Sequence, residues 1–161
     1  MESDNNSQII YEYTKYQIEK ISESIDLITD KLTKILAFSG VFLKFASDIK
    51  PEGLFFIVKI LTIFTLILTI GHCAAGLWSR GTKEVDLKPE YLLNDQYGLS
   101  EERIRVLIVK SWFIKIQALK GIREDRNKML SGAIGFLTIS GLVYGLSEII
   151  NSIDYISHKC F

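Results

Sequence analysis

The sequence has few of the residues that build disulfide frameworks or disordered chains. Its 161 residues include only two cysteines, two histidines and two prolines. The scarcity of proline, together with 48 % hydrophobic residues, argues against intrinsic disorder. Nineteen basic residues balance nineteen acidic ones, so the chain lacks the basic surplus with which nucleic-acid binders release counterions. No nucleic-acid partner is therefore expected.

The sequence also lacks a catalytic constellation. It contains no phosphate-binding glycine loop, no nucleophile elbow and no paired acids. His72 precedes Cys73, but a metal site needs three or four convergent ligands. Cys73 and Cys160 lie near opposite membrane faces in the topology derived below, so both are expected to be free thiols. We expect neither enzymatic activity nor a cofactor or metal.

Two long apolar segments predict transmembrane helices. Residues 54–78 carry one charge, Lys59, and are long enough to cross a hydrocarbon core of about 30 Å. Trp78 at the end of this segment suits an interfacial aromatic belt. Residues 129–150 carry only Glu148, near one end. With a positive mean hydropathy, these segments predict an integral membrane protein.

A third apolar segment, residues 33–49, decides the topology. Lys44 interrupts it, and its length also fits an interfacial helix. Residues 79–128 hold eleven Lys or Arg, which marks them as cytoplasmic. The four lysines of residues 1–34 lie on that same side only if 33–49 spans the membrane. The positive-inside rule therefore favours three spans, with two as the alternative.

The remaining boundaries follow from this topology, with a cytoplasmic N-terminus and an outer C-terminus. Pro51 and Gly53 predict a tight outer turn over 50–53, and residues 151–161 would form a short outer tail. The start of the chain is polar and acidic, so we expect insertion through the chain's own spans. The predicted fold is one all-α membrane domain covering residues 1–161.

Residues 8–34 predict a long amphipathic cytoplasmic helix that continues into the first span. Its apolar positions are spaced by three and four residues and comprise Ile18, Ile21, Ile25, Ile28, Leu32 and Ile35. Isoleucine at both heptad core positions favours trimers or tetramers. We expect a packing seam here, formed within the chain against residues 100–128, between chains, or both.

The cytoplasmic segment 79–128 divides into two parts. Turn-forming residues predict an irregular linker over 79–99. Ser100 can cap a helix over 100–128, with two acids in its first turn. The apolar stripe of this helix consists of Ile108, Trp112, Ile116, Leu119 and Ile122. We expect it to pack on the N-terminal helix or lie at the membrane surface, with a weak point at Gly121.

Basic residues in the cytoplasmic segment offer possible anion or headgroup contacts. They include Arg80, Lys83, Lys88, Arg103, Arg105 and Lys110. One interpretation is a pocket for an anionic ligand such as a nucleotide phosphate. The alternative is positive-inside bias with contact to anionic headgroups.

Three charges lie inside the predicted spans, namely Lys44, Lys59 and Glu148. Each falls within about 10 Å of the outer end of its span. Intramembrane charges are candidate functional residues. They can pair across helices, line a water-filled path in an oligomer, or extend to the nearer interface.

Small residues in the spans predict close helix approach. Two pairs with small-xxx-small spacing are Gly71 with Ala75 and Gly141 with Gly145. Such pairs let backbones come together within one chain or between chains. They therefore predict packing without distinguishing the two.

The order of these elements, with Arg126-Asn127-Lys128-Met129-Leu130 at the entry to the last span, resembles a known architecture. It is similar to the small membrane effectors of bacterial anti-phage signalling, the Pycsar-effector and SLATT-like transmembrane domains. The resemblance covers nearly the whole chain in architecture, and in residues it rests on Asn127-Lys128. It implies a homo-oligomer in the lipid bilayer that disrupts the inner membrane when a nucleotide second messenger signals. No dedicated nucleotide-binding domain is evident in the chain.

The residues leave a second function open. The protein would then be a passive membrane scaffold or accessory subunit. It would dock a cytosolic partner through the N-terminal helix and residues 79–128.

Overall fold

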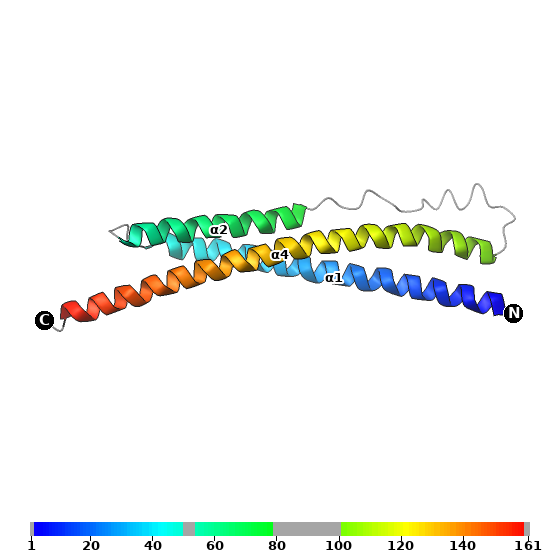
Figure 1. Ribbon diagram of the computed structural model, residues 1–161, viewed down its shortest axis with the longest axis horizontal. Helices are drawn as coiled ribbons and strands as arrows, with labels where there is room; N and C mark the ends of the chain where they lie inside the picture. The colour runs from blue at the N-terminus through cyan, green and yellow to red at the C-terminus, as the bar shows by residue number, and fades with distance from the viewer. Residues whose placement is uncertain (1, 50–53, 79–100, 160–161) are drawn as a thin grey trace. The chain divides into compact units, whose positions relative to one another are not determined.

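The computed structural model describes residues 2–49, 54–78 and 101–159, and this part of the chain contains three α-helices (Figure 1). They are α1 (Glu2–Ser47), α2 (Leu54–Trp78) and α4 (Glu101–Lys159). The all-helical fold class is thereby confirmed. The predicted turn over 50–53 and linker over 79–99 lie outside the described residues.

Two helices are longer than their predicted segments. The 46 residues of α1 begin at Glu2, six positions before the expected start of the amphipathic helix. The 59 residues of α4 are continuous, so the predicted helix 100–128 and the span 129–150 form one element. Neither helix contains proline, and a helical glycine such as Gly121 costs only about 1 kcal/mol, too little to interrupt a packed helix. For the same reason helix replaces the expected tail as far as Lys159.

The chain divides into two compact units, which we describe separately. The first consists of residues 1–28 and 79–125, and the second of residues 29–78 and 126–161. The helices α1 and α4 each contribute to both units.

In the first unit, α1 and α4 run side by side in the same direction (Figure 1). Its core consists of Ile21 and Ile25 from α1 and Ile116 from α4, all buried. The edges of this core are Ile18, Leu119 and Ile122. The Tyr11 and Trp112 ring centroids lie 4.9 Å apart. These contacts correspond to the intrachain alternative for the isoleucine stripe, and the interchain seam stays a prediction.

In the second unit, α2 runs antiparallel to the adjoining parts of α1 and α4 (Figure 1). The three helices meet where Gly76 of α2 faces Leu32 of α1 and Met129 of α4. A Cβ atom placed at Gly76 would lie 2.8 Å from Leu32 Cδ1 and 3.1 Å from Met129 Cβ. One placed at Gly132 of α4 would lie 2.6 Å from His72 Cδ2. A side chain at either position would therefore force its neighbours to shift, and glycine lets the helices come this close without that shift.

The second unit distributes its side chains in the opposite way to a water-soluble protein. Its buried side chains are mostly small or carry a hydroxyl, among them Ser39, Ala46, Thr62, Thr65, Thr69, Cys73, Ala133, Ser140 and Ser147. Its exposed side chains include many large apolar ones, such as Phe38, Val41, Phe45, Phe56, Ile57, Ile60, Phe64, Ile67, Leu142, Leu146 and Ile149. Small residues inside and large apolar residues outside are typical of helices packed in a bilayer.

Two helices are long and apolar enough to cross a membrane. They are the stretches Phe55–Trp78 and Glu102–Ile150, whose most apolar windows are only 22 % and 17 % buried. A core helix of a soluble protein would be mostly buried, whereas these expose their apolar faces. Residues 33–49 are not among them, because Lys34, Lys44 and Asp48 interrupt the apolar sequence.

We expect Gly76→Ala to destabilise the second unit by about 1–3 kcal/mol, the usual cost of overpacking. The added methyl group meets the Met129 Cβ, which cannot rotate away. The measurement is the melting temperature of the purified chain in detergent. Gly135→Ala is the matched control, because no atom lies within 4 Å of its added Cβ. Equal melting temperatures for the two variants would contradict the close approach at Gly76.

Candidate functional site

The interior of the second unit is lined by hydroxyl groups, most of which bond to the helix that carries them. Ser39 donates to the Ile35 carbonyl at 2.8 Å, and Thr69 donates to the Thr65 carbonyl at 2.9 Å. One bond joins two helices, between Thr65 Oγ1 and Ser140 Oγ at 2.5 Å. These bonds satisfy polar atoms locally, and the Thr65–Ser140 bond links α2 to α4.

Thr62 is the exception among the buried hydroxyl groups. Its side chain is fully buried, and its Oγ1 has no hydrogen-bond partner among the described residues. Thr62 also lies one turn before Thr65, whose hydroxyl contacts the Thr62 carbonyl at 3.0 Å. The Thr62 hydroxyl can therefore both donate a hydrogen bond to, and accept one from, a water or polar group that enters this interior.

Lys59 caps the C-terminal end of α1. Its Nζ donates to the Ser47 carbonyl at 2.6 Å and to the Ile49 carbonyl at 3.0 Å. The last carbonyls of a helix have no partners within the helix and carry its negative dipole end, so an ammonium group stabilises them. Of the three predicted intramembrane charges, Lys59 is thus tied to its own chain.

Lys44 and Glu148 are both exposed on the surface of the second unit. Among the described residues, neither forms an ion pair with the other or with Lys59. Glu148 lies one turn beyond Tyr144, whose ring packs on Phe42 of α1 with centroids 5.2 Å apart. The predicted pairing across helices is therefore not formed within one chain.

His72 of α2 packs on α4 through contacts with Gly132 and Phe136. Its Nδ1 lies 2.9 Å from the Leu68 carbonyl oxygen, which can only accept, so Nδ1 carries a proton. The ring lies over Gly132 and 5.1 Å from the Phe136 ring centroid. Cys73 is buried with a free thiol. In the described part of the chain, no cluster of three or more His, Cys, Asp or Glu residues could hold a metal ion.

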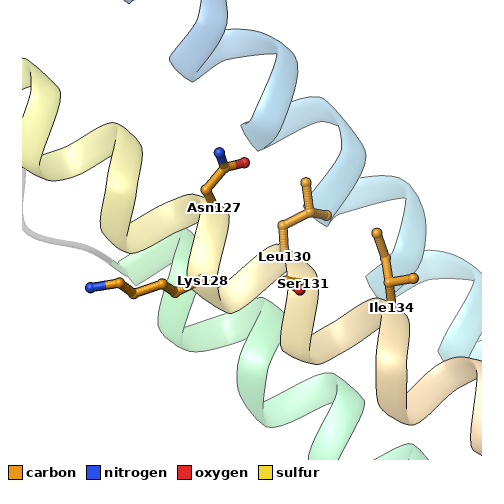
Figure 2. A pocket seen from close by; sticks show the side chains of 5 residues that line it. All are labelled: Asn127, Lys128, Leu130, Ser131 and Ile134. Atoms are coloured by element: carbon orange, nitrogen blue, oxygen red, sulfur yellow. The ribbon is translucent and has the colours of Figure 1, made fainter.

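The entry to the last span carries a polar contact and a surface groove. Arg126 Nη1 donates to the Thr29 hydroxyl of α1, while its buried Nε has no partner in the described structure. A groove of about 500 Å³ follows on α4, lined by Asn127, Lys128, Leu130, Ser131 and Ile134. Figure 2 shows Asn127 and Lys128 diverging at one end of this row and Leu130 and Ile134 pointing to the same side at the other.

The predicted basic cluster is only partly gathered in the described structure. Arg105 and Lys110 line one groove of about 390 Å³ in the first unit, together with Ile10 of α1. Arg103 lines a different groove of about 450 Å³. The other predicted contacts, Arg80, Lys83 and Lys88, lie outside the described residues, as does Cys160.

The predicted small-residue pairs do not form the intrachain contacts. Added Cβ atoms at Gly71, Gly141 and Gly145 would meet nothing within 4 Å, and Ala75 is exposed. The close contacts are formed instead at Gly76 and Gly132. Gly76 is not part of a small-xxx-small pair, so this spacing does not predict its contact. Only the register of the helices identifies that position.

No protein-family model matches the chain, and no curated protein or solved structure matches it significantly. The functional argument therefore rests on this chain's own residues.

We expect Lys59→Met to destabilise the helical hairpin, because it leaves two carbonyls at the end of α1 without their donor. Hydrogen bonds to a charged donor contribute about 1.5–3 kcal/mol. The measurement is chemical or thermal unfolding in detergent, with Lys44→Met as the matched control at an exposed lysine. A loss of stability no greater than that of the control would refute the capping role.

Proposed function

We propose that this chain is a multi-pass inner-membrane protein that assembles with copies of itself and, once assembled, makes the membrane leak. The observation that carries the proposal is the exposure of two opposite charges, Lys44 and Glu148, in the segments predicted to span the membrane. Charges in this position need a partner or water. Glu148 has the Tyr144 hydroxyl as a hydrogen-bond partner, but neither charge has an ion-pair partner within the described chain, so a neighbouring copy is the natural source of the opposite charge.

Three spans are supported by the positions of charged and interfacial residues at the two ends of the second unit. At one level, Arg126 contacts Thr29, and Trp78, which is 87 % exposed, follows Gly76. At the other, Lys59 caps the end of α1. The helical rise places Lys59 and Trp78 about 28 Å apart, close to the thickness of a hydrocarbon core.

The adjoining part of α1 fits the same slab. Phe38, Val41 and Phe45 are exposed, as expected for a lipid-facing surface, while Ser39 and Ala46 face the interior. This periodicity supports residues 33–49 as the third span, with the N-terminus cytoplasmic and the C-terminus outside.

Assembly is supported by the open small-residue faces. Gly71 and Ala75 on α2, and Gly141 and Gly145 on α4, leave room for another helix backbone. Within one chain the polar side chains Thr62, Thr65, Thr69 and Ser140 are buried, so we place the leak between chains. The exposed Lys44 and Glu148 would then lie near its outer mouth.

The trigger belongs to the first unit in this proposal. Arg105 and Lys110 share a groove there, which suits an anionic signal such as a nucleotide second messenger. A cytosolic signalling protein binding the same unit would serve the same purpose.

A second candidate function is favoured by a separate observation. The first unit exposes large apolar side chains, namely Ile9, Ile10, Tyr13, Tyr16, Val106, Leu107, Phe113 and Ile114. Such a surface suits a docking platform for a cytosolic partner. The protein would then be a passive scaffold or accessory subunit, and it would not make the membrane leak.

Topology reporters test the three-span arrangement. We expect a cytoplasmic reporter to be active when fused to the N-terminus, and an outer-compartment reporter to be active after residue 161. The physical reason is that an odd number of spans places the ends on opposite sides. Activity of the same reporter at both ends would support two spans instead.

Membrane potential during induced expression tests the leak. We expect depolarisation by the unchanged chain and at least a tenfold slower response with Gly141→Leu. A Cβ added at Gly141 meets no atom within 4 Å, and the larger side chain occupies the space that a second helix would need. The variant Ile21→Asp would not test assembly in this way, because Ile21 is buried in the core of the first unit.

Gly135→Leu is the control for this experiment. Gly135 is also open, but it lies on a different side of α4 from the Gly141 and Gly145 pair. Equal depolarisation by both variants would exclude assembly through this pair. An intact potential for the unchanged chain at verified membrane levels, with a stable captured partner, would favour the scaffold.

A further inference from the structure

We propose that the groove at the start of the last span, formed by Asn127, Lys128, Leu130, Ser131 and Ile134, binds an acidic phospholipid. The inference rests on the proposed function in one respect, namely that this end of the second unit lies at the cytoplasmic face of the bilayer. It adds a ligand class and a site that the assembly itself does not require.

The lining of the groove changes from polar to apolar along α4. Asn127 and Lys128 form one end, Ser131 lies a turn further on, and Leu130 and Ile134 form the apolar part (Figure 2). Lys128 supplies ammonium donors on one side of this row and Asn127, which diverges from it, supplies an amide donor on the other; each group suits a phosphodiester oxygen. Leu130 is buried, so Ile134, which is exposed, provides the surface along which an acyl chain can lie. A soluble phosphate would use only the polar end.

The charge around this level favours an anion. Lys31 and Lys34 of α1 lie at the same level, because the neighbouring Leu32 and Thr29 contact the Gly76–Met129 region and Arg126. Lys34 is paired with Asp30 at 2.6 Å. Within residues 29–34 and 126–134 the remaining charges, Lys31, Arg126 and Lys128, are all positive, and the nearest acids along α4 are Glu124 and Asp125, one turn before Lys128. A lipid with a net negative headgroup complements this arrangement, whereas a zwitterionic one does not.

Trp78 supports a lipid over a water-soluble ligand. It follows Gly76, which contacts Leu32 and Met129, so it lies at the level of the groove, and it is 87 % exposed. Exposed tryptophan at the end of an apolar helix is typical of the headgroup region of a bilayer. The groove therefore opens where phospholipid headgroups are found.

The test is native mass spectrometry of the full chain in mild detergent, with phosphatidylglycerol or phosphatidylcholine of identical acyl chains. We expect preferential retention of phosphatidylglycerol, and about a tenfold loss of that preference in Lys128→Gln, as for a lost charged hydrogen bond. Asn127→Leu should give a smaller loss. Lys15→Gln, at an exposed lysine of the first unit, is the matched control and should retain the preference.

Three results would overturn the proposal. They are equal retention of the two lipids by the unchanged chain, equal loss of preference in Lys15→Gln, and complete displacement of phosphatidylglycerol by inorganic phosphate. The last result would assign the site to a soluble anion. The assay does not depend on conduction, so a lipid preference without depolarisation would reject the leak and retain this site. Depolarisation without a lipid preference would do the reverse.

Discussion

The close approach of α2 to its two neighbours is the constraint on which the second unit depends. In lipid, apolar side chains gain little by leaving one apolar environment for another, so helix association relies on dispersion contacts and hydrogen bonds. Gly76 and Gly132 bring the backbones near enough for those contacts to accumulate. The Thr65–Ser140 hydrogen bond and the stacking of His72 on Phe136 follow from that proximity, because both need short helix separations.

The two units use different physical solutions to hold helices together. The first buries branched apolar side chains, Ile21, Ile25 and Ile116, as a protein in water does. The second places hydroxyls and small residues inside and large apolar residues outside. Each solution fits one solvent, and the change from one to the other occurs along α1 and α4. This change of pattern is the strongest argument for a bilayer around the second unit.

Charge placement connects this architecture to the proposed function. Lys59 is occupied with the end of α1, so it is unsuited to serve as a free charge in a conducting path. Lys44 and Glu148 face outward instead, and although Glu148 bonds to the Tyr144 hydroxyl, neither has an ion-pair partner in the described chain. The open glycine faces lie on α2 and α4. Assembly can therefore bring together small residues and opposite charges that one chain leaves apart.

The sequence by itself determined the helical class, the two most apolar helices and the isoleucine stripe, because each depends on local composition and periodicity. It also named the charges within the apolar segments, Lys44, Lys59 and Glu148. It could not decide which of them is used within the chain, since Lys59 meets the end of α1 only through the register of the hairpin. Likewise, small-xxx-small spacing pointed to Gly141 and Gly145, whereas the contacts formed at Gly76 and Gly132. Only the tertiary structure decides this, because helix rotation and register, rather than residue type, determine which glycine faces a neighbour.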